Sequence, residues 1–407
     1  MDSHTAARGW IEHGGEALDQ ALCLVMRGPR SFTGEDIVEF HCHGGPAIIR
    51  RTLEAVLEMG ARLAAPGEFT RRAFLSGRID LAQAEAVADM VAGETEAAIR
   101  AAARQLEGGL SQRLEDLRRT LMETLALLEA GVDFSEHEDV RSISREELEE
   151  RLDAVICSLA KLVDDAGRGR LLREGARLVI AGRPNVGKST LMNSLLRKER
   201  VIVTPEPGTT RDIVEEVMEI GGVPVRMLDT AGIRAHAGDI EKLGVDLAKG
   251  AVRDADFVIM MIDGSSELTE DDRLLAEMVE APAIVAINKS DLPATVSEEE
   301  AGQLFPHSAI VRISALQGDG LDGLETALSR LMATGEGERP LVTNARHEEA
   351  LKRTREAVER AHKVSGESEE FIASDIRQAL ESLGEITGET VTDEVLDHIF
   401  SRFCVGK

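Results

Sequence analysis

The segment AGRPNVGKST at residues 181–190 restricts the fold of this chain more than any other part of its sequence. It matches the pattern G-x-x-x-x-G-K-[ST], it directly follows the apolar run RLVIA, and it precedes the helical pattern LMNSLLRK. A loop in this position wraps its backbone N–H groups around phosphates at the positive end of a helix. We therefore predict that Lys188 reaches the β- and γ-phosphates of a nucleotide and that Ser189 ligates Mg²⁺. The alternative, a glycine turn that only joins a strand to a helix, is disfavoured by the motifs that follow.

Apolar runs alternate with helical stretches on both sides of this loop. Five of them lie between about residues 175 and 335: RLVIA (177–181), VPVRML (223–228), FVIMMI (257–262), AIVAIN (283–288) and AIVRI (309–313). Continuous apolar strands that alternate with helices are typical of a parallel sheet covered on both faces. We therefore predict an α/β domain of the Ras-like P-loop type.

Helical and mixed segments flank that domain. Leucines recur every three or four residues from Leu114 to Leu128 and again from Leu148, which predicts helices packed in a core rather than a ligand site. Strand-like runs at 21–26 and 36–43 predict an α+β region near the N-terminus. The expected segments are an N-terminal α+β domain (1–77), a first helical part (78–174), the α/β domain (175–335) and a second helical part (336–407). The α/β domain is thus expected to be inserted in a discontinuous all-α domain.

Three further motifs follow the loop in the order and at the strand ends that a GTPase needs. DTAG ends the run at 223–228, and its glycine amide would sense the γ-phosphate. NKSD ends the run at 283–288, and the Asp291 carboxylate can accept hydrogen bonds from N1–H and N2–H₂ of guanine, which adenine cannot supply. SAL at 314–316 would close over the base through backbone amides. The residues expected in these contacts are Asp229, Thr230, Ala231, Gly232, Asn288, Lys289, Ser290, Asp291, Ser314, Ala315 and Leu316.

The stretch PGTTRD at 207–212 lies where the first switch of a GTPase belongs, and Thr210 is the natural second hydroxyl ligand of Mg²⁺. Together with the phosphate loop it completes the set of predicted nucleotide contacts. These are Asn185, Val186, Gly187, Lys188, Ser189, Thr190, Thr204, Pro205, Glu206, Pro207, Gly208, Thr209 and Thr210.

Composition narrows the partners. The formal charge of −27 repels phosphodiester backbones, and 3% aromatic residues leave few platforms for stacking bases. We therefore expect any RNA to be held mainly by a partner. No run approaches the length of a membrane span, and four scattered cysteines without a C-x-x-C pair indicate neither zinc nor disulfides, so a cytoplasmic location is expected. His41 and His43 share a strand face, but no third metal ligand is apparent near them.

These motifs, with SFTGEDIVEFHCHGGP (31–46), FTRRAFLSGRIDLAQAEAVADM (69–90) and the terminal FCVGK, resemble the MnmE (TrmE) family of tRNA uridine-modification GTPases. The resemblance spans essentially the whole chain. It implies a GTPase that works with the flavoprotein MnmG to add an aminomethyl or carboxymethylaminomethyl group to C5 of the wobble uridine, U34, of certain tRNAs. FAD and NADH would come from that partner.

The resemblance also suggests how a water is held where Ile233 replaces the glutamine of many small GTPases. It implies that K⁺ replaces an arginine finger when two G domains pair, and that Asn185, Thr204, Glu206 and Thr209 coordinate it. Glu241 would position the water. Ordinary alternatives remain open: Asn185 as a turn residue, Glu241 as a solvated glutamate, and Arg211 and Arg234 as ion-pair members rather than charge stabilisers. The catalytic set is thus expected to be Glu241, Asn185, Lys188, Gly232 and Thr210.

The N-terminal segment is implied to form a homodimer and to bind 5-formyl- or methylene-tetrahydrofolate through Glu39, Arg78 and Lys407. Against the family pattern this sequence lacks the first strand, the first helix and a GRGG…R segment, so an incomplete domain is expected. Cys404 is implied to contribute to modification. An alternative function is a ribosome-assembly or translation-associated GTPase switch, although no basic RNA-binding module is visible. A structural protein with a degenerate site is disfavoured because every GTPase motif is intact.

Overall fold

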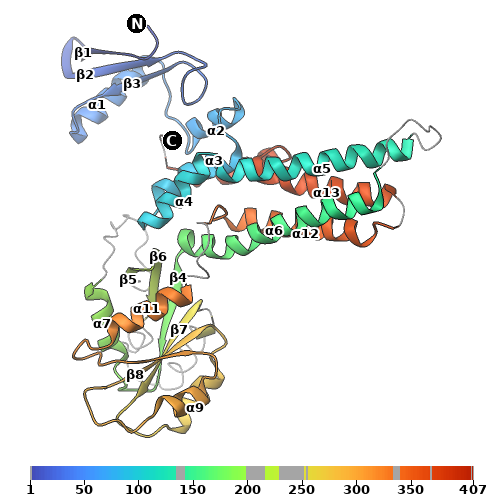
Figure 1. Ribbon diagram of the computed structural model, residues 1–407. Helices are drawn as coiled ribbons and strands as arrows, with labels where there is room; N and C mark the ends of the chain where they lie inside the picture. The colour runs from blue at the N-terminus through green and yellow to red at the C-terminus, as the bar shows by residue number, and fades with distance from the viewer. Residues whose placement is uncertain are drawn as a thin grey trace. The chain divides into compact units, whose positions relative to one another are not determined.

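The computed structural model describes residues 2–133, 143–198, 216–228, 252–253, 255–332, 340–366, 369–404 and 406 (Figure 1). The chain forms two compact units. The first contains Met1–Val91, Ala102–Ala160 and Glu349–Lys407, and the second contains Ala92–Ala101 and Lys161–Glu348. The boundaries expected from the sequence at 77, 174 and 335 remain predictions.

A small antiparallel sheet begins the first unit. Its strands are β1 (Thr5–His13), β2 (Glu16–Met26) and β3 (Ile37–His41), in the spatial order β1-β2-β3. Gly14 and Gly15 join β1 to β2 with φ angles of 59° and 84°. A two-residue hairpin turn with positive φ at both positions matches the twist of its strands, and glycine adopts it without steric cost.

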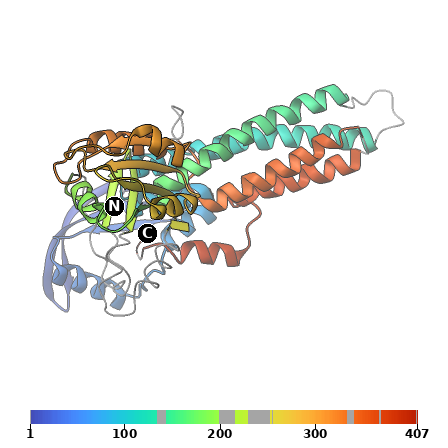
Figure 2. The same ribbon diagram turned by 90° about the horizontal axis from the view of Figure 1, so that it is seen from below.

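Helices make up the rest of this unit: α1 (Pro46–Glu58), α2 (Glu68–Leu75), α3 (Leu81–Ala92), α5 (Gly109–Asp133), α12 (Ala345–Lys363), α13 (Glu369–Thr387) and α14 (Asp393–Phe400). Two more helices are α4 (Glu96–Leu106) and α6 (Arg145–Glu174). Both of them, together with the first four residues of α12 and the last residue of α3, contribute residues to the second unit. Figures 1 and 2 show α5, α6, α12 and α13 side by side as a bundle. The leucines of α5 that recur every three or four residues are buried, which confirms the predicted core stripe: Leu114, Leu117, Leu121, Leu125 and Leu128.

The C-terminal end of the described chain packs on α2 and α3. Phe400 and Phe403 join Leu81 in a buried cluster, with the two phenyl ring centres 5.3 Å apart. Gly67 precedes α2 with φ 65°, and a Cβ there would lie 2.9 Å from the Phe400 carbonyl oxygen. A glycine is therefore required where α2 meets the C-terminal segment.

The second unit is built on a six-stranded sheet in the order β5-β6-β4-β7-β8-β9. Its strands are β4 (Ala176–Ala181), β5 (Glu216–Ile220), β6 (Val223–Leu228), β7 (Phe257–Asp263), β8 (Ala283–Asn288) and β9 (Ala309–Arg312). All neighbouring pairs are parallel except β5 with β6. The predicted α/β class is confirmed. The edge strand β5 was not predicted, and neither was β1.

Side chains from alternate positions of β4 enter two different cores. Leu178 and Ile180 belong to one, while Val179 and Ala181 belong to the other. Helices cover both faces: α7 (Lys188–Lys198) and α11 (Leu321–Met332) on the first, α9 (Glu270–Glu277) and α10 (Glu298–Leu304) on the second. This explains the continuous apolar runs of β7 and β8, in which every residue is buried. None of the helices in the described part of the chain combines the length and apolar character needed to span a bilayer.

Candidate nucleotide-binding site

The predicted phosphate loop joins β4 to α7. Gly182 and Gly187 have φ angles of 150° and 104°, and Asn185 has a φ of 65°. A Cβ on Gly187 would lie 2.4 Å from Asn288 Nδ2, and one on Gly182 would lie 2.6 Å from the Met261 carbonyl oxygen. Both glycines are therefore needed for the backbone to pass this close to the neighbouring strands.

The lysine of the loop lies over its own backbone. Lys188 Nζ donates hydrogen bonds to the carbonyl oxygens of Gly182, at 2.7 Å, and Arg183, at 2.8 Å. Ser189 and Thr190 are exposed in the first turn of α7. The loop thus presents an ammonium group, two hydroxyls and a helix N-terminus together, which is the arrangement that binds phosphates.

Asn288, at the end of β8, joins two loops of the site. Its buried Nδ2 donates to the Val186 carbonyl oxygen at 2.7 Å, and its Oδ1 accepts from the Ala315 N–H at 2.9 Å. The Ala315 carbonyl oxygen in turn accepts from Ser194 Oγ of α7 at 3.0 Å. The structure therefore brings the predicted phosphate loop, NKSD motif and SAL turn together at the carboxyl ends of the parallel strands.

Two further members of NKSD, Asp291 and Lys289, are fixed by side-chain contacts. Asp291 Oδ1 accepts from Ser314 Oγ at 2.6 Å, so the carboxylate is oriented by the turn that would close over the base. Lys289 has a φ of 66°, and its Nζ lies 2.6 Å from Asp263 Oδ2. Leu316 is exposed.

Asp263 is a residue that sequence reasoning missed. Burial disfavours its ionised form, but hydrogen bonds from Lys289 and Ser265 outweigh this and hold the pKa of the carboxyl below its ordinary value. It is the last residue of β7 and lies beside Asn288 in the register of β7 with β8. Its position at the end of a buried parallel strand could have identified it, because that edge of the sheet carries the site.

Several predicted site residues lie outside the described residues. These are Thr204, Pro205, Glu206, Pro207, Gly208, Thr209, Thr210, Asp229, Thr230, Ala231, Gly232, Glu241 and Lys407. The expected roles of the two switch segments, of Ile233, Arg211 and Arg234, and of the terminal lysine therefore stay predictions.

The N-terminal candidates are described with one exception, Lys407. Glu39 on β3 pairs with His41 at 3.1 Å, and the Arg78 side chain lies against Gly34. No hydrogen bond or ion pair between described residues joins Glu39 to Arg78. Cys404 is exposed, and its carbonyl oxygen accepts from the Gly67 N–H at 3.4 Å.

The two histidines considered for a metal each have a carboxylate partner. His41 pairs with Glu39, and His43 Nδ1 lies 2.7 Å from Asp19 Oδ1. The backbone N–H of His43 also donates to Asp19, at 2.8 Å. Only His41 belongs to β3, so the shared strand face expected for the two histidines does not extend to His43.

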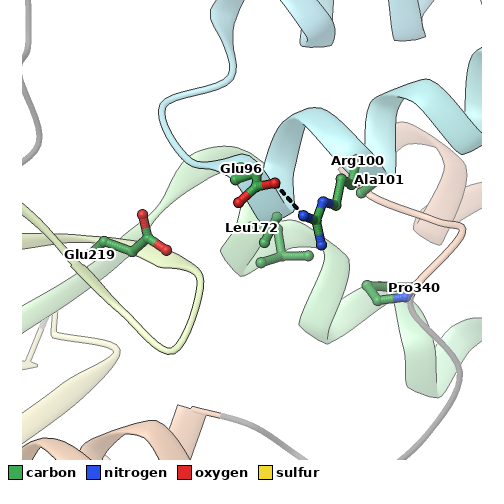
Figure 3. Close-up of a pocket in the computed structure, with 7 residues that line it drawn as sticks. Glu96, Arg100, Ala101, Leu172, Glu219 and Pro340 are labelled. Atoms are coloured by element: carbon green, nitrogen blue, oxygen red, sulfur yellow. Dashed lines mark hydrogen bonds and ion pairs between the residues drawn. The ribbon is translucent and has the colours of Figure 1, made fainter.

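A cavity of about 220 Å³ lies elsewhere in the second unit (Figure 3). Its lining comprises Glu96, Ala97, Arg100, Ala101, Leu172, Glu219 and Pro340. Glu96 and Arg100 form an ion pair with each other, and nearby Thr95 Oγ1 donates to the Gly222 carbonyl oxygen at 2.8 Å. The cavity therefore marks where the first turns of α4 pack on the β5–β6 hairpin, and two of its charged side chains, Glu96 and Arg100, pair with each other.

Comparison with known proteins identifies the family. Residues 81–404 match the family described as "MnmE helical domain", and residues 1–78 match "GTP-binding protein TrmE N-terminus". Proteins from Symbiobacterium thermophilum and Heliobacterium modesticaldum are 45% and 47% identical, each over 100% of this chain and 90% of their own length. A protein from Aquifex aeolicus is 45% identical over 97% of this chain and 88% of its own. Each of the three is called "tRNA modification GTPase MnmE". Because the family patterns and these relatives cover nearly all of the sequence, this chain belongs to the MnmE (TrmE) family of GTPases.

Proposed function

We propose that this chain hydrolyses GTP as part of a tRNA modification that adds an aminomethyl or carboxymethylaminomethyl group to C5 of the wobble uridine, U34, together with MnmG. GTP hydrolysis would drive a conformational step. The names of the relatives support a role in tRNA modification. The acidic charge of −27 supports a division of labour in which the partner holds most of the tRNA.

The observation that carries the GTPase part is the double contact of Asn288 with the phosphate loop and the SAL turn. Since the buried Asn288 amide joins the phosphate loop to the SAL turn, it fixes the base end of the site relative to the phosphate end. Asp291, oriented by Ser314, would accept from N1–H and N2–H₂ of guanine. Any base without these donors would leave the Asp291 carboxylate with only its hydrogen bond from Ser314 and would bind more weakly.

Magnesium fits the phosphate end of the site. Ser189 offers an exposed hydroxyl in the first turn of α7, beside the Lys188 ammonium group, and Thr210 would supply a second hydroxyl. Bound Mg²⁺ would neutralise charge on the β- and γ-phosphates. The residues of the chain orient the nucleotide: Lys188 would exchange its bonds to loop carbonyls for bonds to phosphate oxygens, and Asp229 would contact Mg²⁺ through a water.

Potassium fits the exposed Asn185. Its backbone is left-handed and the residue is exposed, and an amide oxygen is a suitable ligand for an alkali cation. Thr204, Glu206 and Thr209 would complete the coordination, and the cation would stabilise the charge that develops during hydrolysis. Glu241 would position the water, with Gly232 and Thr210 contacting the γ-phosphate. Pairing of two G domains would complete this arrangement.

Folate would bind the N-terminal region of a homodimer. Glu39 offers a carboxylate for the polar ring edge, and Arg78 and Lys407 offer charges for the carboxylates of the ligand. A formyl- or methylene-tetrahydrofolate would supply the carbon, and FAD and NADH would act on the partner. Cys404 is close in sequence to Lys407, and its carbonyl oxygen accepts a hydrogen bond from the Gly67 N–H. It would contribute to the modification.

Mass spectrometry of tRNA nucleosides tests this proposal. Cells in which this chain is the sole member of the family should carry the C5 group on U34, and Asp291→Asn should abolish it because guanine recognition is lost. Asp271→Asn, an exposed position on α9, is the matched control and should keep the modification. Full modification without the chain, combined with a ribosome-assembly defect, would support the GTPase-switch alternative instead.

Hydrolysis rates in K⁺ and Na⁺ test the cation proposal separately. The rate should be at least tenfold higher in K⁺ and should increase with protein concentration, because an active site completed by pairing depends on association. Equal rates in the two salts would exclude the role of Asn185 as a potassium ligand without affecting guanine recognition.

A further inference from the structure

The segment that joins β7 to α9 contacts the nucleotide site at two separate places, and no GTPase motif covers it. On the base side, Asp263 Oδ2 lies 2.6 Å from Lys289 Nζ, and the Gly264 N–H donates to the Asn288 carbonyl oxygen at 2.8 Å. On the phosphate side, Ser266 Oγ accepts a hydrogen bond from the guanidinium of Arg183, the second residue of the phosphate loop. Residues 263–272 therefore reach both ends of the site.

Arg183 is held at the phosphate end by a buried carboxylate as well. Its Nε lies 3.7 Å from Asp272 Oδ2, and the two side chains are 18% and 0% exposed. Asp272 is itself fixed at the start of α9, because the same oxygen accepts from Thr269 N and Oγ1 at 2.9 and 2.8 Å. A buried carboxylate needs its counter-charge, so Arg183 cannot move without cost. The carbonyl oxygen of Arg183 also accepts from Lys188 Nζ, so the position of this arginine bears on the lysine that contacts phosphate.

At the base end, Asp263 holds a residue in an unfavourable backbone conformation. Lys289 has a φ of 66°, a left-handed conformation that is unfavourable for a non-glycine residue. The salt bridge to Asp263, which is in turn fixed by Ser265 N and Oγ at 3.0 and 2.6 Å, offsets that cost. The geometry of the NKSD loop thus depends on a carboxylate outside the motif.

We propose that residues 263–272 form a positioning segment that couples the phosphate loop to the guanine-recognition loop. Asp263 is its contact residue at the base end, and Ser266 and Asp272 hold Arg183 of the phosphate loop at the other end. Neither Asp263 nor Arg183 is among the predicted nucleotide contacts. Because the segment is short, a displacement at one end is transmitted to the other. A hydrogen bond from Thr295 N to the Gly264 carbonyl oxygen, at 2.8 Å, restrains the segment between its two ends. The alternative is that the two ion pairs stabilise the fold independently of each other.

Discrimination between GDP and inosine diphosphate (IDP), which lacks the 2-amino group, separates the two possibilities. Both dissociation constants are measured by calorimetry on the full chain. Asp263→Asn should raise the Kd for GDP about tenfold and reduce the preference for GDP over IDP, because the NKSD loop loses its support. Arg183→Ala should also raise the Kd about tenfold and should reduce the same preference, although its side chain lies at the phosphate end.

The double variant and two controls complete the experiment. Because both residues act through one segment, the Kd of Arg183→Ala/Asp263→Asn should rise by clearly less than the product of the single effects. The controls Arg273→Ala and Asp271→Asn, exposed on α9, should keep wild-type affinity and preference. Arg183→Lys retains the charge opposite Asp272 and replaces Arg183→Ala if the alanine variant does not fold. An unchanged GDP-to-IDP preference in the Arg183 variants, or strictly multiplicative effects in the double variant, would overturn the proposal.

Discussion

The two sheets formed by the described residues differ in how completely they are buried. In the six-stranded sheet, β7 and β8 are buried along their whole length, and each face is covered by helices of the same unit. In the three-stranded sheet most residues of β1 and β3 are exposed, and Trp10 and Phe40 keep 62% and 46% of their surface accessible.

The six-stranded sheet therefore lies inside a core of its own unit, whereas the three-stranded sheet leaves large apolar side chains exposed. The core of the nucleotide-binding sheet is covered by helices of its own unit, and such a rigid scaffold can position the loops of the site. The N-terminal sheet leaves Leu22 exposed on one face and Val38 and Phe40 exposed on the other, because Leu22 is paired with His41, whereas Phe40 is paired with Cys23. Exposed apolar side chains of this kind can mark an interaction surface. A homodimer through the face that carries Leu22, as one form of the dimer proposed above, would bury this side chain.

The largest expected effect comes from one substitution made in both sheets. Leu178→Ala, in β4 with 0% exposure, should lower the free energy of unfolding of its unit by about 3–4 kcal/mol, because it leaves a cavity in a covered core. Leu22→Ala, in β2 with 47% exposure, should lower the stability of an isolated copy by less than about 1 kcal/mol.

The chain carries a built-in probe for the second measurement. Trp10, its single tryptophan, lies in β1, so tryptophan fluorescence during urea unfolding reports the N-terminal sheet alone. Loss of bound fluorescent GDP reports the other unit. A cost for Leu22→Ala that grows with protein concentration would show that a second copy covers this surface, and equal costs at both leucines would contradict the contrast drawn here.

Asn288→Ala should have the next largest effect, and it acts on function. The substitution leaves the buried Val186 carbonyl and Ala315 N–H without a partner, at about 1–3 kcal/mol for each group, so the Kd for GDP should rise on the order of 100-fold. Calorimetry measures the Kd directly. Asn193→Ala, exposed on α7, is the matched control. A rise below threefold for Asn288→Ala would show that the two loops hold their geometry without the amide.

The same contrast explains what the sequence could predict. The runs that became β4, β7 and β8 are continuous because both of their faces are covered, so they were visible as a parallel sheet. The strand β1 was missed because TAARGWIEH has neither a continuous nor an alternating apolar pattern, and it is mostly exposed. The short edge strand β5 has only five residues and pairs on one side.

The residues of the candidate site also fall into two groups, those that sequence motifs could predict and those that they could not. Motif spacing predicted Lys188, Asn288 and Asp291 as site residues, because each belongs to a contiguous pattern with a known chemical requirement. Asp263 and the Arg183 ion pair were missed because they depend on the register of β7 with β8 and on the start of α9, which single-sequence patterns do not specify. Register is a property of the packed sheet rather than of either strand.

Glu68 tests how charge stabilises the N-terminal region, and its expected effect is smaller than those of Leu178→Ala and Asn288→Ala. Hydrogen bonds from Arg62, from the Ala65 N–H at 2.9 Å and from Arg72 hold the pKa of the Glu68 carboxyl far below its ordinary value. A lowered pKa in the folded state stabilises the fold above the unfolded pKa of about 4.3, and this contribution is lost progressively as the pH falls toward the folded value.

Glu68→Gln should therefore cost about 1 kcal/mol at pH 7, after screening of the exposed arginines, and progressively less as the pH falls below about 4. Unfolding by urea, followed through Trp10, measures the difference, with the exposed Glu54→Gln on α1 as a control that should change little. A difference that stays constant from pH 7 down to the lowest pH at which the unit remains folded would assign the loss to packing rather than to charge.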